Sequence, residues 1–177
     1  MSSFEGSEII YHPQKRRKSL SLRFDQSENV FHFYYPDFIS RAYLLKFLMD
    51  KQKWMEKVRK TNAGKIILKI EDLPPRNEIF QFFKQRLDEI SLESGLNYRK
   101  LRLRKMKSRW GSCSADNEIT LNTLTFLLPA NLRDFILYHE LCHTKIKNHS
   151  IKFYELLRKH VPEERKRNRE LKDYILT

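Results

Sequence analysis

The sequence HELCH at residues 139–143 places two histidines four positions apart, with a glutamate directly after the first. On an α-helix this spacing puts both imidazoles on one face, one turn apart, where they can bind the same metal ion. Glu140 would point about 100° further round the helix, so it is poorly placed as a ligand but can reach a water molecule on the ion. The segment therefore predicts two metal ligands, His139 and His143, and a general base, Glu140.

A third metal ligand is expected at His149. Catalytic zinc sites commonly have three protein ligands and leave the fourth position to water. A continuous helix would carry His149 about 15 Å beyond His139 along its axis, so the helix must end between His143 and His149. Asn148 can end a helix in the left-handed conformation, and Ser150 can cap the next helix. We therefore expect His139, His143 and His149 to bind one Zn²⁺ ion.

The spacing of His149 equals that of the extended pattern HExxHxxGxxH, but Ile146 occupies the glycine position. The glycine turn and methionine turn of the metzincins therefore cannot be carried over. The residues before the pentapeptide are apolar and recur at helical spacing: Leu132, Phe135, Ile136 and Leu137. They predict a buried helix, which favours a metal site over the alternatives, a chance pentapeptide without metal and a capping or surface role for His149.

The rest of the chain predicts short strands and amphipathic helices. Strands are expected at 19–25, 30–35, 66–70, 98–107 and 118–122, the first two forming a hairpin. Helices are expected at 40–62, 77–95, from Pro129 or Asn131 through the pentapeptide, at 151–160 and at 163–173. These elements predict an α+β fold in which a small mixed or antiparallel sheet packs on the HELCH helix. We expect a single domain, 1–177, with a strand hairpin and helices in 1–97 and the core around the HELCH helix in 98–177.

Composition narrows the class of protein. The chain has 177 residues, 40% of them hydrophobic, which suffices for a globular core. Lys and Arg number 35 against 22 Asp and Glu, a formal charge of +13 that favours anionic partners. No apolar run reaches the roughly 18 residues of a membrane span, and the N-terminal segment is too polar for a secretion signal. With only Cys113 and Cys142 as thiols, the sequence predicts a basic, cytoplasmic protein with reduced cysteines and no membrane partner.

Four motifs carry a resemblance to a known family. They are RWGSCS at 109–114, ITLN at 119–122, HELCH at 139–143, and Asn148-His149-Ser150 with Phe153. In these the chain resembles the YgjP-like metallopeptidase family, related to the SprT and WLM zinc-protease domains. The resemblance is detailed in the C-terminal part and weaker in the N-terminal half. It implies a zincin-like α+β fold, zinc bound by His139, His143 and His149, and Glu140 as base, and it implies little about the substrate.

The favoured interpretation is a zinc-dependent hydrolase, specifically a metallopeptidase that uses a zinc-bound water activated by Glu140. Zinc acts as a Lewis acid and lowers the pKa of its water from 15.7 towards about 7. The strand 118–122 is expected at a sheet edge, where it could pair with an extended peptide or protein substrate. Trp110, Ser112 and Asn122 could then hold the substrate backbone; the alternative is that Trp110 packs and Asn122 makes a turn bond.

Two other functions stay open. The metal could serve a nucleoside triphosphate pyrophosphatase, with basic residues neutralising the phosphates, although the sequence has no P-loop. The chain could also be a nucleic-acid-binding module with a structural zinc. Residues 99–109 contain seven basic residues and no acid: Arg99, Lys100, Arg102, Arg104, Lys105, Lys107 and Arg109. Such a strip suits phosphate contact, although it could equally be a solvated face.

Overall fold

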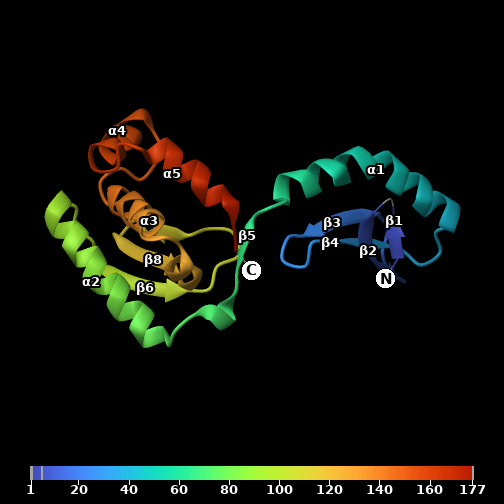
Figure 1. Cartoon of the computed structure of the whole chain (residues 1–177), viewed down its shortest axis with the longest axis horizontal. Coiled ribbons are helices and arrows are strands. Elements are labelled where there is room, and N and C mark those ends of the chain that lie inside the picture. The colour runs from blue at the N-terminus through green and yellow to red at the C-terminus, as the bar shows by residue number, and fades with distance from the viewer. Residues whose placement is uncertain (1, 5, 177) are drawn as a thin grey trace. The chain divides into compact units, whose positions relative to one another are not determined.

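The computed structural model describes residues 2–4 and 6–176, and the chain divides into two compact units, Met1–Lys65 and Ile66–Thr177 (Figure 1). This boundary differs from the subdivision at residues 97 and 98 expected from the sequence. The expected second helix belongs with the C-terminal unit, because it packs on the helix and sheet that follow it. The single-domain organisation stays a prediction.

The first unit is a sheet with one helix. Its elements are β1 (Ser2–Phe4), β2 (Ser7–Gln14), β3 (Ser21–Asp25), β4 (Val30–Pro36) and α1 (Arg41–Asn62), and its strands lie in the order β1-β2-β4-β3. The predicted hairpin is confirmed as the antiparallel pair β3 and β4, with Asn29 at positive φ in its turn. Ser40 caps α1 as expected, its hydroxyl accepting a hydrogen bond from the Tyr43 N–H. Strands β1 and β2 were not expected; β2 runs parallel to β4.

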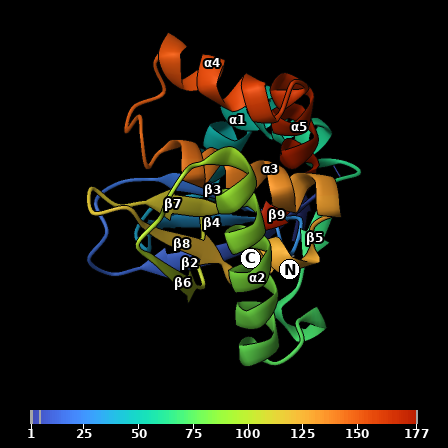
Figure 2. The same cartoon turned by 90° about the vertical axis from the view of Figure 1, so that its left-hand side faces the viewer.

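The second unit combines short strands with helices (Figures 1 and 2). Its strands are β5 (Ile66–Leu68), β6 (Lys100–Arg104), β7 (Gly111–Cys113), β8 (Glu118–Asn122) and β9 (Tyr174–Leu176). Its α-helices are α2 (Arg76–Ser94), α3 (Ala130–Cys142), α4 (Ile151–His160) and α5 (Glu164–Glu170), with 3₁₀ turns at Ile70–Asp72, Thr123–Leu127 and Leu171–Asp173. The predicted α+β class is confirmed. No helix within residues 2–4 and 6–176 has the length and apolar character that a membrane crossing needs.

Strand β8 lies in the middle of its sheet, not at the edge as expected. The order is β6-β8-β7, with β6 parallel and β7 antiparallel to β8. The Trp110 carbonyl accepts from the Asn122 N–H, and the Ser114 N–H donates to the Glu118 carbonyl. Because bonded pairs alternate along an antiparallel ladder, the N–H and C=O groups of Gly111 and Cys113 face away from β8. Strand β7 is therefore one of the two edge strands of this sheet, β6 being the other, and Gly111 and Cys113 present their backbone groups outward from it.

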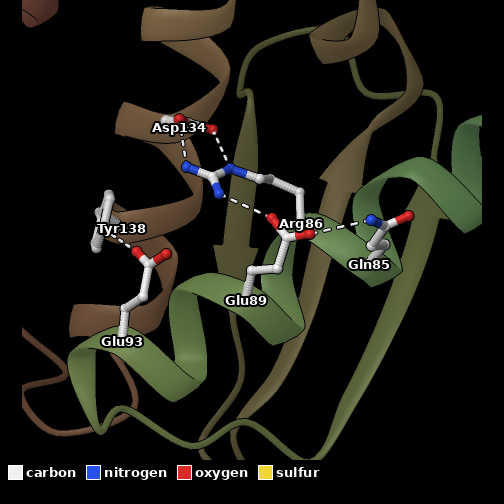
Figure 3. Close-up of polar contacts among 6 residues, drawn as sticks. All are labelled: Gln85, Arg86, Glu89, Glu93, Asp134 and Tyr138. Atoms are coloured by element: carbon white, nitrogen blue, oxygen red, sulfur yellow. Dashed lines mark hydrogen bonds and ion pairs between the residues drawn. The ribbon is translucent and has the colours of Figure 1, made fainter.

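The predicted buried helix is confirmed in α3. Apolar residues of α3, α2 and the sheet share one core: Leu132, Phe135, Ile136, Leu137, Leu141, Ile79, Phe83, Leu87, Ile90, Leu101, Leu103, Ile119 and Leu121. Figure 2 shows α2 running across the direction of the strands of this sheet. At the helix surface the Arg86 guanidinium donates to both carboxylate oxygens of Asp134, at 3.1 and 2.9 Å, and to Glu89 (Figure 3). This bidentate pair fixes α2 against the helix that carries His139 and Glu140.

Candidate metal centre

Three imidazoles converge at the C-terminal end of α3. His139 lies in the last turn of α3, His143 is the residue after the helix, and His149 lies in the loop before α4. Their Nε2 atoms are 3.3 Å apart between His139 and His143, 3.1 Å between His143 and His149, and 3.1 Å between His149 and His139. Nitrogen ligands of a tetrahedral zinc ion, each at 2.0–2.1 Å, are about 3.3 Å from one another. The three side chains could therefore hold one divalent metal ion.

The loop that brings His149 back is closed by backbone hydrogen bonds. Helix α3 ends at Cys142, and the N–H groups of Lys145 and Ile146 both donate to its carbonyl. Apart from glycines, only Asn29 and Asn117 have positive φ in the described part of the chain. The expected left-handed conformation of Asn148 was therefore wrong, and a glycine is not required at Ile146 either. Ser150 precedes α4 as expected, but its side chain makes no capping hydrogen bond.

Neighbouring groups orient the imidazoles. The Nδ1 atom of His143 lies 3.0 Å from the Ile146 carbonyl oxygen, so it carries the proton and leaves the Nε2 lone pair facing the other two rings. The Phe153 ring is fully buried and stacks on His143 with a centroid separation of 4.4 Å. Burial, followed by the nearby His143 and His149, lowers the pKa of His139 to about 3. Its imidazole is therefore neutral at neutral pH, which is the form that binds metals.

Glu140 follows His139 on α3 and lines the same cavity, and only 5% of its surface is exposed. Its Oε2 atom has no hydrogen-bond partner among the described residues. Burial raises the pKa of Glu140 to about 8, and the positive charge of Arg109 opposes this effect. An unpartnered carboxylate oxygen in a protein interior is unfavourable unless a cation or a water completes its environment. The donor set and this oxygen together fit a divalent metal with water beside it.

Gly111 of β7 provides the space that Glu140 occupies. A Cβ atom at position 111 would lie 2.7 Å from Oε1 and 2.8 Å from Cγ of Glu140, closer than such atoms approach in proteins. In the sequence, Gly111 stands out only as part of the RWGSCS motif. Its role depends on how β7 packs on α3, and three residues containing one glycine carry too little pattern to predict either the strand or the contact.

A cavity of about 240 Å³ opens beside His139 and Glu140. Its apolar walls are formed by Trp110, Phe135, Ile136, Leu157 and Leu171. Its other lining residues are Arg109, Gly111, Tyr154, Glu164 and Asn168. Sequence reasoning missed the contribution of α4 and α5, because no spacing signal connects these residues with α3. Of the three residues expected to hold substrate, Trp110 lines this cavity and packs on the core, and Ser112 lies on β7.

Asn122 makes the turn bonds that were the alternative to substrate contact. Its side chain is fully buried. The amide donates to the carbonyls of Met106 and Arg109, at 2.6 and 3.1 Å, and Oδ1 accepts from the Leu124 N–H at 3.2 Å. These polar atoms anchor the loop before β7, so the expectation of direct substrate contact by Asn122 is replaced by a role in positioning Arg109 and Trp110.

The two cysteines lie outside the cluster of candidate metal ligands found in the described residues. Cys142 is fully buried, and burial raises the pKa of its thiol to about 12, so it serves as a small apolar side chain. Burial also raises the pKa of Cys113, while the nearby Lys147 ammonium opposes this effect. Both environments favour the protonated thiol, which is a poor metal ligand.

The basic strip is partly neutralised. Arg99 and Arg102 form ion pairs with Glu118 of β8, with N–O distances of 2.9 and 2.7 Å. Glu118 is distant from the strip in sequence but is the strand neighbour of Lys100. Phosphate binding by this strip stays a prediction, with two of its seven charges already paired.

A family model identifies the family of this chain. The family model described as YgjP-like, metallopeptidase domain, matches residues 74–174, which is more than half of the chain. The metallopeptidase zymogen of Pyrococcus abyssi abylysin is similar at 24% identity and a TM-score of 0.46, over 50% of this chain and 90% of that one. The zymogen of Methanocaldococcus jannaschii jannalysin is similar at 28% identity and a TM-score of 0.43, over 50% and 94%. No curated protein matches. The chain belongs to the YgjP-like metallopeptidase family, and so to the metal-dependent hydrolases.

Proposed function

We propose that the chain is a zinc-dependent peptidase in which His139, His143 and His149 hold one zinc ion and Glu140 is the general base. The observation that supports this most directly is the close approach of the three Nε2 atoms, within 3.3 Å of one another, at the end of the helix on which Glu140, with its unpartnered and buried Oε2, follows His139. An oxygen in that position is free to take a proton from a water molecule at the centre. Three imidazole nitrogens are a donor set that suits zinc.

Bound zinc would lower the pKa of water and polarise the substrate carbonyl. Glu140 would take a proton from the attacking water on Oε2 and deliver it to the leaving amine nitrogen. Burial favours the neutral carboxyl, with a pKa of about 8 in the protein without metal, whereas a cation beside it favours the carboxylate. These opposing effects suit a group that must both accept and release a proton near neutral pH.

An extended peptide is proposed to pair with β7. The outward N–H and C=O groups of Gly111 and Cys113 offer the backbone hydrogen bonds that add a strand to a sheet. Gly111 also lies against Glu140, so a peptide on this edge would pass beside the catalytic carboxylate. This assignment moves the peptide-binding edge from 118–122, where the sequence suggested it, to β7, with Ser112 on the same strand and Trp110 next to it.

The proposal is tested by offering unstructured polypeptides and nucleoside triphosphates side by side to the full-length, zinc-loaded protein. We expect polypeptide cleavage that stops on chelation and returns when zinc is added. Mass spectrometry of the products identifies the cleaved bonds, and a pyrophosphate assay measures the competing reaction. Pyrophosphate release without peptide cleavage would contradict the peptidase proposal and favour the triphosphate alternative.

Gly111→Ala is expected to lower kcat by about 10- to 100-fold while zinc binding is unchanged. The added Cβ would displace the Glu140 carboxylate, whereas the three imidazoles do not contact position 111 in this way. Steady-state kinetics and metal analysis of the same preparation check this result. Full activity with alanine at 111 would mean that Glu140 need not occupy its observed position.

A further inference from the structure

The cavity beside Glu140 is lined by one arginine, Arg109, whose charge also acts on Glu140. Glu164, on the cavity wall, is buried and paired with Arg158 and Arg165, at 3.2 and 3.7 Å. The Arg109 guanidinium also lines the cavity, but it makes no hydrogen bond or ion pair with the residues that the structure describes. Arg109 is exposed, so its charge is available to a ligand.

The backbone around Arg109 is held firmly. The buried Asn122 amide donates to the carbonyls of Met106 and Arg109. The next carbonyl, of Trp110, accepts from the Asn122 N–H at 2.8 Å and from the Thr125 hydroxyl at 3.1 Å. Since both anchoring residues are fully buried, the backbone from which the Arg109 side chain extends is held in place.

The walls of the cavity suit a large apolar side chain. Apart from Arg109, the titratable groups in the lining are His139, Glu140, Tyr154 and the paired Glu164. A triphosphate would bring several negative charges close to both glutamates, with one free arginine to balance them. A single carboxylate matches one guanidinium in charge and in the planar geometry of a two-hydrogen-bond pair.

We propose that Arg109 binds a carboxylate of the peptide substrate while the adjoining apolar side chain fills the 240 Å³ cavity. The inference rests on the proposed peptidase function and narrows it to a substrate class: peptides with a carboxylate next to a large apolar residue. That carboxylate is either the C-terminus of the peptide or an acidic side chain. Arg109 is thus a residue that determines specificity, and Glu140 and the imidazoles carry the reaction.

The test uses full-length, zinc-loaded protein and three matched peptides. One ends in phenylalanine with a free carboxylate, one ends in phenylalanine amide, and one continues from phenylalanine to an amidated aspartate. We expect the free acid, the aspartate peptide or both to be cleaved with a kcat/KM about tenfold or more above that of the phenylalanine amide. Arg109→Gln removes this difference by raising KM for the peptides that carry the carboxylate, whereas loss of its charge near Glu140 changes the rate on all three peptides by one common factor. The peptide whose kcat/KM falls further than that of the phenylalanine amide in Arg109→Gln shows whether the bound carboxylate is the C-terminus or the acidic side chain.

Arg104→Gln is the matched control, because Arg104 is also exposed on the basic strip but does not line the cavity. It should behave as wild type. A second readout avoids turnover: fluorescence anisotropy of labelled peptides with the Glu140→Gln protein, where Arg109→Gln should weaken binding of the carboxylate peptide about tenfold. Unchanged zinc content and melting temperature in Arg109→Gln show that the fold is intact.

The outcomes separate the inference from the function on which it rests. Peptide cleavage with no dependence on Arg109, or an equal loss on all three peptides, overturns the inference and leaves the peptidase function standing. Carboxylate binding that depends on Arg109, without cleavage of any peptide, supports the subsite and contradicts the peptidase. Loss of triphosphate hydrolysis in Arg109→Gln, without discrimination among peptides, assigns the arginine to phosphate and overturns the inference.

Discussion

Glu140→Gln is expected to retain one zinc ion per chain and to lose peptide hydrolysis by about 10²- to 10⁴-fold. Glutamine has the same shape as glutamate, so it fits against Gly111, but its amide cannot accept the proton of the attacking water. The three imidazoles are unchanged, which preserves metal binding. The neutral amide avoids the larger cost of burying a carboxylate charge, so the variant should be at least as stable as wild type. Single-turnover kinetics with metal analysis measures both properties.

Glu155→Gln is the matched control for this variant. Glu155 is an exposed glutamate of α4 that does not line the catalytic cavity, so its loss should leave turnover unchanged. If Glu140→Gln kept full turnover of a peptide that the wild type cleaves, Glu140 would not be the general base. If it lost zinc as well as activity, Glu140 would have a role in holding the metal.

His149→Ala should weaken zinc binding by more than about 100-fold and lose activity with the metal. Loss of a partner that only orients a ligand already costs 10- to 100-fold in affinity, and His149 is proposed as a ligand itself. The two remaining imidazoles, His139 and His143, lie one turn apart at the end of α3, and they supply only two of the three nitrogen ligands. Competition with a chromophoric chelator measures the affinity. Zinc restored in large excess should recover little activity, because the site geometry is incomplete.

His160→Ala is the matched control for the metal site. His160 stacks on Tyr138, at a centroid separation of 5.4 Å, and is outside the three-histidine cluster. Its replacement should leave zinc affinity unchanged. Equal zinc affinity in His149→Ala and wild type would mean that the third ligand lies elsewhere.

The sequence predicted those parts of the site that depend on local geometry. Helical periodicity alone placed His139 and His143 on one face and buried α3, and axial rise alone required the chain to turn before His149. The means of turning was not predictable, because backbone hydrogen bonds to the Cys142 carbonyl close the loop where a left-handed Asn148 was expected. Several conformations can close a short loop, and residue type decides weakly among them.

Long-range pairing accounts for most of the differences. Strand β7 is only three residues long, too short to show an alternation of apolar and polar residues, so it was not predicted. Strand β8 was therefore assigned to the sheet edge that β7 occupies. Strand β2 pairs in parallel with β4, and the local sequence pattern of either segment does not indicate that they are neighbours. Asn122 illustrates the same limit at one residue: its sequence context allowed both substrate contact and a turn bond, and only burial by neighbouring segments decided between them.

X-ray absorption spectroscopy at the zinc edge of the full-length, zinc-loaded protein tests the shared coordination of one ion by three histidines. The predicted spectrum has three imidazole nitrogens at about 2.0–2.1 Å, and His149→Ala removes one of them. A sulfur ligand at about 2.3 Å, an unchanged imidazole count in His149→Ala, or failure of the protein to retain zinc would contradict the proposed centre.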